Sequence, residues 1–117
     1  MIDSATTNAI TRVQIARYAG AVGDFNPMHI DDDFAQAAGL PSIIAHGPLT
    51  LTLVIDALVA QLGVAQLKSF DARLRAPVFP GDSLEIVSID DGLEVRNSSG
   101  AVVAIVQLET TDGASAQ

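Results

Sequence analysis

The sequence predicts an α+β domain in which an antiparallel β-sheet wraps around one long central α-helix. Helical patterns occupy the first half of the chain and short strands follow in the second, an order typical of α+β folds. The segment from about Pro48 to Leu62 is apolar on almost every side, so it must be surrounded rather than laid on a surface. With 117 residues, the chain fits a single domain over residues 1–117.

Start and stop signals define the individual elements. Thr11 and Gln14 form the Thr-x-x-Gln pattern of a capping box. Gly39 followed by Pro41 is typical of a helix end, and Pro48 suits a first helical position, where no N–H partner exists. Turn residues separate the strands, and we expect residues 1–10 and 112–117 to be flexible. The predicted helices span about 12–22, 34–38 and 48–62, and the strands about 66–76, 83–89, 93–96 and 101–110.

Composition excludes several classes of function. A net charge of −8 with only six basic residues argues against binding to nucleic acid. The chain has no cysteine, which excludes disulfides and thiolate chemistry and fits a reducing cytoplasm, where we expect the protein. Residues 1–9 lack the pattern of a signal peptide. Polar residues interrupt the apolar segment before Gly63, which favours a buried helix over a membrane span.

Asp24 and His29 form the most informative pair in the chain. Five residues along a helix would separate the side chains by about 140°, and in a strand they would face opposite sides. Pro27 keeps Asn26 out of the helical region and fixes its own backbone, which predicts a rigid turn. Such a turn can aim a carboxylate and an imidazole at one point for general acid–base chemistry. The plainer alternatives are that Asp24 only caps the turn and that His29 is a core residue.

Three segments, Tyr18 to His29, Ala45 to Thr50 and Arg73 to Asp82, resemble the MaoC-like (R)-specific enoyl-CoA hydratases, also called type-2 hydratases. The resemblance implies a hot-dog fold. It also implies that the protein adds water to a trans-2-enoyl thioester, giving the (R)-3-hydroxyacyl thioester, or runs the reverse dehydration. The expected substrate is an acyl-CoA or an acyl carrier protein thioester, with no further cofactor.

The resemblance also implies roles for individual residues. Asp24 and His29 match the family's catalytic dyad, Asn26 matches the residue that supports the loop, and Gly47 matches the backbone N–H donor of the oxyanion site. Pro48 departs from the larger apolar residue of many members. Some members carry two hot-dog units and others pair with a different MaoC-like chain, so both a homodimer and a heteromer remain open.

The residues themselves give this chemistry a physical basis. A carboxylate and an imidazole can hold one water between them and move both protons on the same face of the substrate. Gly47 stands where the long helix is expected to begin, and the N–H groups there lack intrahelical partners. Pro48 has no N–H, so the amide of Gly47 is the nearest donor for a thioester oxygen.

Other polar residues have plainer interpretations. We expect His46 to shape the backbone before Gly47 rather than to react, and Thr50 and Thr52 to serve packing. The acidic run Asp31 to Asp33 is typical of a helix cap, and no metal site is expected there. Arg73 and Arg75 lie two apart on a predicted strand and share a face, either solvated or in contact with the phosphates of an acyl carrier.

The sequence leaves three candidate functions. The first is the hydratase or dehydratase. The second is a non-catalytic or partner-dependent hot-dog subunit of a heteromeric hydratase, whose marker would be the loss of Asp24 or His29. The third is a hot-dog acyl thioesterase, which would direct water at the carbonyl carbon. Dimerisation is expected because a small sheet leaves an open edge.

Overall fold

The computed structural model describes residues 2–111, and the predicted flexible tail at 112–117 lies outside these residues. Its helices are α1 (Arg12–Val22), α2 (Asp32–Ala37) and α3 (Gly47–Leu62), with short 3₁₀ helices η1 (Pro27–His29) and η2 (Val64–Gln66). Its strands are β1 (Ala5–Thr6), β2 (Leu67–Leu74), β3 (Glu85–Ile89), β4 (Gly92–Arg96) and β5 (Val102–Thr110).

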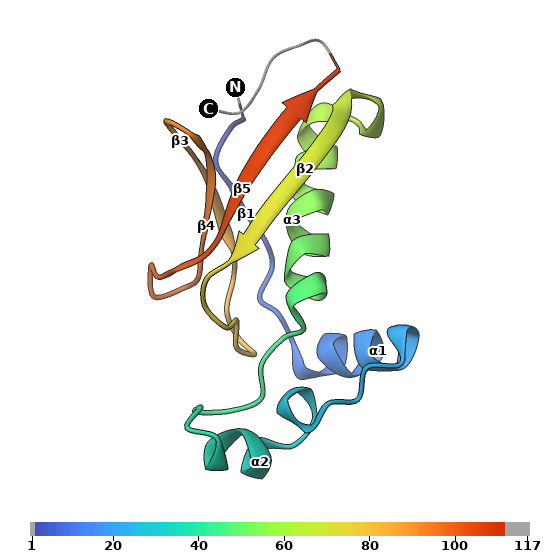
Figure 1. Ribbon diagram of the computed structural model, residues 1–117, viewed down its shortest axis with the longest axis vertical. Coiled ribbons are helices and arrows are strands. Elements are labelled where there is room, and N and C mark those ends of the chain that lie inside the picture. The colour runs from blue at the N-terminus through green and yellow to red at the C-terminus, as the bar shows by residue number, and fades with distance from the viewer. Residues whose placement is uncertain (1, 112–117) are drawn as a thin grey trace.

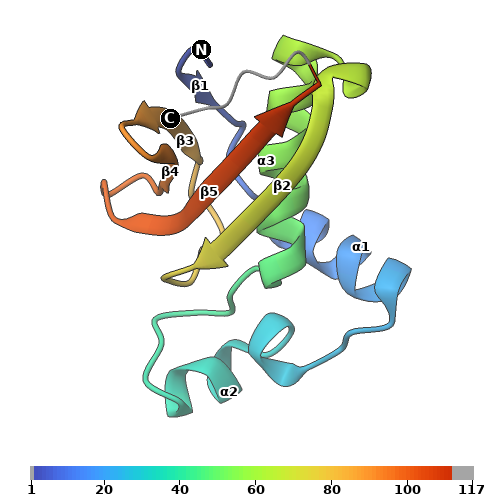
Figure 2. The same ribbon diagram turned by 45° about the horizontal axis from the view of Figure 1, so that its top comes forward.

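The strands form one five-stranded sheet in the order β1-β3-β4-β5-β2, in which every pairing is antiparallel. The helix α3 runs along one face of this curved sheet (Figures 1 and 2). The predicted α+β architecture, with an antiparallel sheet and one long helix, is therefore confirmed. None of the helices within residues 2–111 is both long enough and apolar enough to cross a membrane.

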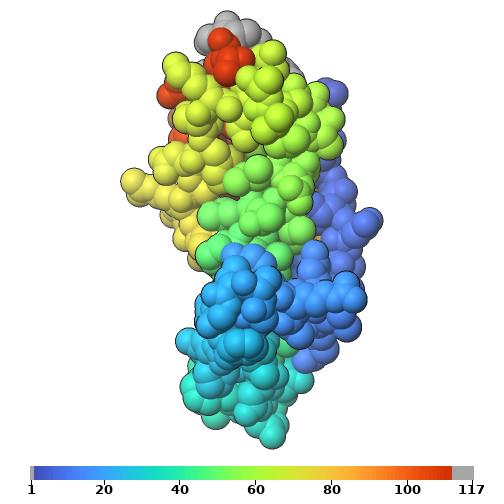
Figure 3. Space-filling view, turned by 90° about the vertical axis from the view of Figure 1, so that its right-hand side faces the viewer, coloured from blue at the N-terminus to red at the C-terminus, as the bar shows by residue number. Residues whose placement is uncertain are grey.

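The core lies between α3 and the sheet. Thr50, Val54 and Leu58 are buried at intervals of four residues, the spacing of one helix face. Val54 and Leu58 pack in a cluster with buried side chains of the sheet and its loops, among them Leu84, Ile86, Leu93, Val95, Val103, Val106 and Leu108. The opposite side of α3 stays partly exposed within one protomer and is visible in Figure 3 between β2 and the N-terminal segment.

Residues 2–10 are packed against the rest of the fold, in contrast to the flexible segment expected. Ile2 and Ile10 are 5% and 1% exposed, and β1 pairs with β3. Ile10 is also fixed by its backbone, whose N–H donates to Asp82 and whose carbonyl accepts from Gly81. Two isolated isoleucines in a polar segment carry no periodic pattern, so only their burial in the folded chain reveals this packing.

The helices α1 and α2 form a lobe that projects beyond the end of α3 (Figure 1). The hydroxyl of Thr11 accepts from the N–H of Gln14 at 3.0 Å, as the capping pattern predicts. Asp32 joins the lobe to the segment that leads into α3, because its carboxylate accepts from the N–H of Ile43 at 3.0 Å and pairs with Arg12 at 3.0 Å. The Ile43 hydrogen bond, followed by the Arg12 guanidinium, holds the pKa of Asp32 below its ordinary value of 3.8.

Replacing Ile10 by Ala should lower the free energy of unfolding by about 2–4 kcal/mol, since it removes a fully buried side chain. Urea unfolding of the purified protein measures this change. Val13→Ala is the matched control, because Val13 is 61% exposed and should change stability by no more than about 0.5 kcal/mol. Equal effects of the two substitutions would show that the N-terminal segment is not packed.

Asp32→Asn should lower the melting temperature at neutral pH by weakening the contacts with Ile43 and Arg12. Because the pKa of Asp32 is lowered in the folded state, its stabilisation is complete above the ordinary value and is lost as the pH falls through the lower folded value. The difference from wild type should therefore shrink below about pH 4. Asp33→Asn controls for the loss of an acid from the same turn of α2. If the difference in melting temperature between wild type and Asp32→Asn stayed constant down to about pH 2, the lowered pKa of Asp32 would be contradicted.

Candidate active site

Asp24 is placed by the end of α1. Gly23 ends that helix in the left-handed region, with φ of 74°, a conformation that glycine adopts without strain. The N–H of Asp24 still donates to Ala19 at 3.1 Å. The Asp24 carboxylate then accepts from the N–H of Asn26 at 3.3 Å, and the Asn26 side chain accepts from the N–H of Met28 at 3.0 Å. Two successive side-chain turns therefore shape the loop.

His29 closes the loop at the end of η1. Its N–H donates to the carbonyl of Asn26 at 2.9 Å, and its Nδ1 contacts the carbonyl of Ile44 at 2.8 Å. A carbonyl only accepts, so Nδ1 is the donor and, in the neutral ring, Nε2 carries the lone pair. Ile44 in turn donates its N–H to Met28 at 3.0 Å. The ring is thus oriented with Nδ1 engaged and with Nε2 as its basic nitrogen.

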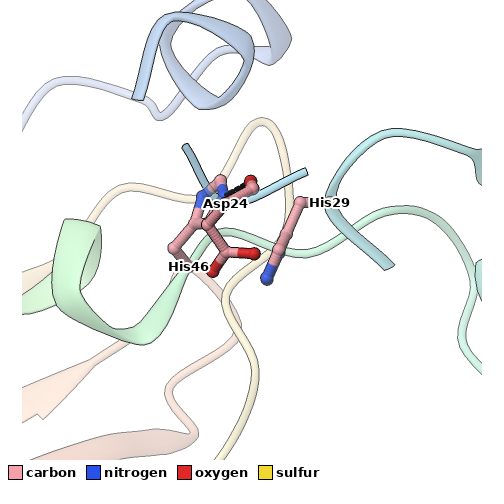
Figure 4. Close-up of side chains that lie close together, drawn as sticks. All are labelled: Asp24, His29 and His46. Carbon is pink, nitrogen blue, oxygen red and sulfur yellow. Dashed lines mark hydrogen bonds between the residues drawn. The ribbon is translucent and has the colours of Figure 1, made fainter. Parts of the chain in front are cut away.

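His46 lies directly against this pair (Figure 4). It is 1% exposed, its Nε2 donates to the backbone carbonyl of Asp24 at 3.0 Å, and its ring stacks on that of His29 with centroids 3.8 Å apart. Tyr18 packs on it at 4.9 Å. Its Nδ1 is buried and has no hydrogen-bond partner within residues 2–111. The expectation that His46 merely shapes the backbone before Gly47 therefore understates its contacts.

The spacing of the three side chains suits a shared water molecule. Asp24, His29 and His46 each offer an atom that lies within 4.8 Å of the others. Two acceptors at such a separation can both hydrogen-bond one water at about 2.8 Å. Asp24 is exposed and His29 half-exposed, so solvent can reach the position between them.

The same three residues are of types that ligate metal ions, and one ligand atom of each lies within 4.8 Å of the others. Each histidine donates its other nitrogen to a backbone carbonyl, as metal ligands usually do. The two rings, however, are stacked with an angle of only 25° between their planes. A ring nitrogen binds a metal in the plane of its ring, and nearly parallel planes do not meet at the bond length of about 2.1 Å. The observed arrangement does not fit an ion shared by both rings.

Gly47 is the first residue of α3 and borders a cavity of about 350 Å³. A Cβ atom at this position would lie 2.5 Å from Cδ1 of Leu74, so glycine permits the close approach. The side chains of Asp24 and His29 are not part of the cavity wall in this protomer. The wall is mostly apolar and consists of Ile44, Ala45, Gly47, Thr50, Leu74, Arg75, Ala76, Pro77 and Val78.

Arg73 and Arg75 are brought together, as their spacing predicts. Both line a second cavity of about 320 Å³ beside Asp71, and Arg75 also lines the cavity that holds Gly47. Both arginines are exposed, and neither forms an ion pair within residues 2–111. Thr50, expected to serve packing only, lines the first cavity. Its spacing of three from Gly47, which puts both on one side of the helix, was the available signal.

Similarity to known proteins extends over nearly the whole chain. The model of the MaoC like domain matches residues 2–112. The chain is 40% identical over 99 residues to 3-hydroxyacyl-thioester dehydratase Y of Mycobacterium tuberculosis, an alignment that covers 81% of this chain and 32% of that protein. The chain therefore spans about a third of the length of this relative.

Solved structures agree on the fold. The unliganded R-hydratase PhaJ1 of Pseudomonas aeruginosa superposes with a TM-score of 0.77 at 25% identity, covering 92% of this chain and 77% of that one. The ChsH1–ChsH2 complex of Mycobacterium tuberculosis gives 0.73 at 23% identity, covering 93% and 92%. These similarities confirm the predicted hot-dog fold, and together with the domain match they show that the chain belongs to the MaoC-like domain family.

Proposed function

We propose that this chain catalyses the (R)-specific hydration of trans-2-enoyl thioesters or the reverse dehydration of (R)-3-hydroxyacyl thioesters. One observation carries the proposal: a carboxylate oxygen of Asp24 and a ring nitrogen of His29 lie within 4.8 Å of each other, a separation that one water molecule can bridge. The hydrogen bond to Ile44 leaves Nε2 of His29 free as the base. The names of the relatives, which include a 3-hydroxyacyl-thioester dehydratase and an R-hydratase, support the same reaction.

In the hydration direction, Asp24 and His29 hold a water molecule against Cβ of the enoyl group. As the water oxygen bonds to Cβ, one of its protons passes to the pair and the electrons of the double bond move toward the thioester carbonyl. The resulting enolate is then protonated at Cα by the pair, which restores both groups. Because both proton transfers occur on one face, the addition is syn. General acid–base help of this kind contributes roughly 10²–10⁴-fold.

The amide of Gly47 is the proposed donor to the thioester oxygen. It opens α3, where N–H groups have no partner inside the helix and the helix dipole is positive. A donor of this type is worth about 2.7–4 kcal/mol in the transition state. The apolar cavity beside Gly47 offers space for the acyl thioester, and Asn26 supports the loop opposite through its bond to Met28.

Arg73 and Arg75 are the proposed contacts for the phosphates of the carrier, either CoA or an acyl carrier protein. Both guanidiniums are free of ion pairs within residues 2–111, and Arg75 lies between the two cavities. The proposed reaction uses no metal and no cofactor besides the thioester, and we place it in the cytoplasm.

A second chain is proposed to complete the assembly. The strand β2 is an edge of the sheet, and exposed edges favour pairing with another chain. Either a second copy or a different MaoC-like chain fits this edge, as the complex of ChsH1 with ChsH2 illustrates for a similar fold. A partner-dependent subunit is the alternative function. It is favoured by the absence of the Asp24 and His29 side chains from the wall of the cavity that holds Gly47.

One assay separates hydration from the alternatives. Purified protein is incubated with crotonyl-CoA and longer trans-2-enoyl-CoA esters while enoyl absorbance and free thiol are followed together. Loss of absorbance without thiol, giving the (R)-3-hydroxy product, is the expected result. Thiol release without hydration would identify a thioesterase instead. Activity that appears only after addition of a second MaoC-like chain would identify the partner-dependent subunit.

Asp24→Asn and His29→Ala should each lower kcat at least about a hundredfold, because each removes a group that holds or moves the proton. Circular dichroism should show an intact fold, since both residues are at least partly exposed. Asp33→Asn is the matched control, because it removes an exposed carboxylate of α2 that does not belong to the cluster of Asp24, His29 and His46. Near-normal turnover in either dyad variant would show that the dyad is misplaced.

Arg75→Gln should raise KM for an acyl-CoA about two- to fivefold with kcat nearly unchanged, as expected for one exposed ionic contact. The KM of wild type should also increase with ionic strength more steeply than that of the variant. Arg17→Gln, which removes an exposed arginine from α1, should leave KM unchanged. Identical KM and salt dependence in wild type and Arg75→Gln would remove this residue from the carrier site.

A further inference from the structure

We infer that His46 is a positioning residue for the proposed Asp24–His29 pair, acting through its Nε2–H and through the face of its ring. This inference rests on the proposed function of that pair. His46 contacts both members, the backbone of one and the ring of the other, and it directly precedes Gly47 in the chain. It therefore links the two proton-handling groups to the proposed oxyanion donor.

The first support is the direction in which His46 reaches. It occupies the N-cap position of α3, yet its side chain makes no capping hydrogen bond. Its Nε2 instead donates to the carbonyl of Asp24, 22 residues earlier in the chain. That carbonyl follows the end of α1, and a donor there fixes the backbone from which the Asp24 carboxylate projects.

The second support is the way in which the His29 ring is held. The hydrogen bond from its Nδ1 to Ile44 sets the rotation of the ring within its plane. The stacked ring of His46, at 3.8 Å and 25°, blocks tilting out of that plane on one side. Tyr18 lies against His46 at 4.9 Å, so the blocking ring is itself packed. Together these contacts aim the free Nε2 of His29.

The third support is the unpartnered Nδ1 of His46. Because Nε2 donates to Asp24, Nδ1 carries the lone pair in the neutral ring, and it is buried without a hydrogen-bond partner within residues 2–111. A buried polar atom left without a partner costs free energy. A phenyl ring of similar size would fill the space without this cost. An imidazole here is therefore explained by its N–H donor, not by packing alone.

Loss of His46 should change the positions of Asp24 and His29 and not the affinity for the thioester. Without His46, the carbonyl of Asp24 loses its donor and the His29 ring gains freedom to tilt. A displacement of about 1 Å in a catalytic group can lower a rate about 10²-fold. We therefore expect the loss of His46 to lower kcat while leaving KM for the thioester nearly unchanged.

Three substitutions separate the two contacts. His46→Ala removes both, His46→Phe keeps the ring face without the donor, and His46→Gln keeps an amide donor at the position of Nε2 without the ring. We expect His46→Ala to lower kcat at least about tenfold while KM stays within about twofold of the wild-type value. The variants His46→Phe and His46→Gln should each retain part of the kcat that His46→Ala loses. Val54→Ala, which shortens another buried residue of α3, should lower the melting temperature without lowering kcat.

Nitrogen NMR of the histidine rings gives a readout that does not depend on activity. In wild type we expect the proton of the neutral ring on Nε2 for His46 and on Nδ1 for His29. In His46→Ala, the His29 ring is free to tilt away from the carbonyl of Ile44 and to lose the hydrogen bond that sets its tautomer, so its signals should shift toward a mixture of tautomers. Full kcat per folded molecule in His46→Ala, or a kcat loss shared by Val54→Ala at equal thermal destabilisation, would overturn the inference.

The two proposals fail in different ways. A wild-type protein that hydrates no enoyl thioester contradicts the proposed function, and the NMR result still decides the role of His46. An unchanged His29 tautomer in His46→Ala overturns the positioning role even in an active enzyme. A changed tautomer supports it.

Discussion

The extended segment Ile44–His46 is the connection on which the rest of the structure depends. Ile44 exchanges hydrogen bonds with the loop of the lobe, through Met28 and the ring of His29. Ala45 donates to Val78 on the other side. This short stretch, bonded to both neighbours, fixes the lobe to the remainder of the fold and sets the start of α3. The orientation of the His29 ring and the start of α3 depend on it.

The site combines two kinds of rigidity. The Asn-Pro loop is stiffened locally, by Pro27 and by side-chain turns at Asp24 and Asn26. The start of α3 supplies an amide whose direction is set by a long helix packed on the sheet. Groups held on such supports stay close to one position and orientation despite thermal motion. The proposed reaction, which moves a proton and places charge on a thioester oxygen, would benefit from both supports.

The same architecture leaves surfaces that a single protomer does not cover. The edge strand β2 and the outer side of α3 are open (Figure 3), and Leu74 at the end of β2 is 48% exposed while it also borders the cavity of Gly47. A chain docked along this edge would therefore lie close to the proposed oxyanion donor. In the proposed function, a chain docked there would couple assembly to substrate access.

Short-range sequence signals determined much of this protein. The cap at Thr11, the turn at Pro27 and the apolar helix before Gly63 depend on neighbours within a few residues, and the structure reproduces them. The three segments that resemble the MaoC-like family likewise indicated the fold and the candidate pair. Only the tertiary structure decided that Ile2 and Ile10 are buried and that His46 lies on His29. Those facts rest on contacts between distant parts of the chain, which no local pattern encodes because packing, not propensity, selects them.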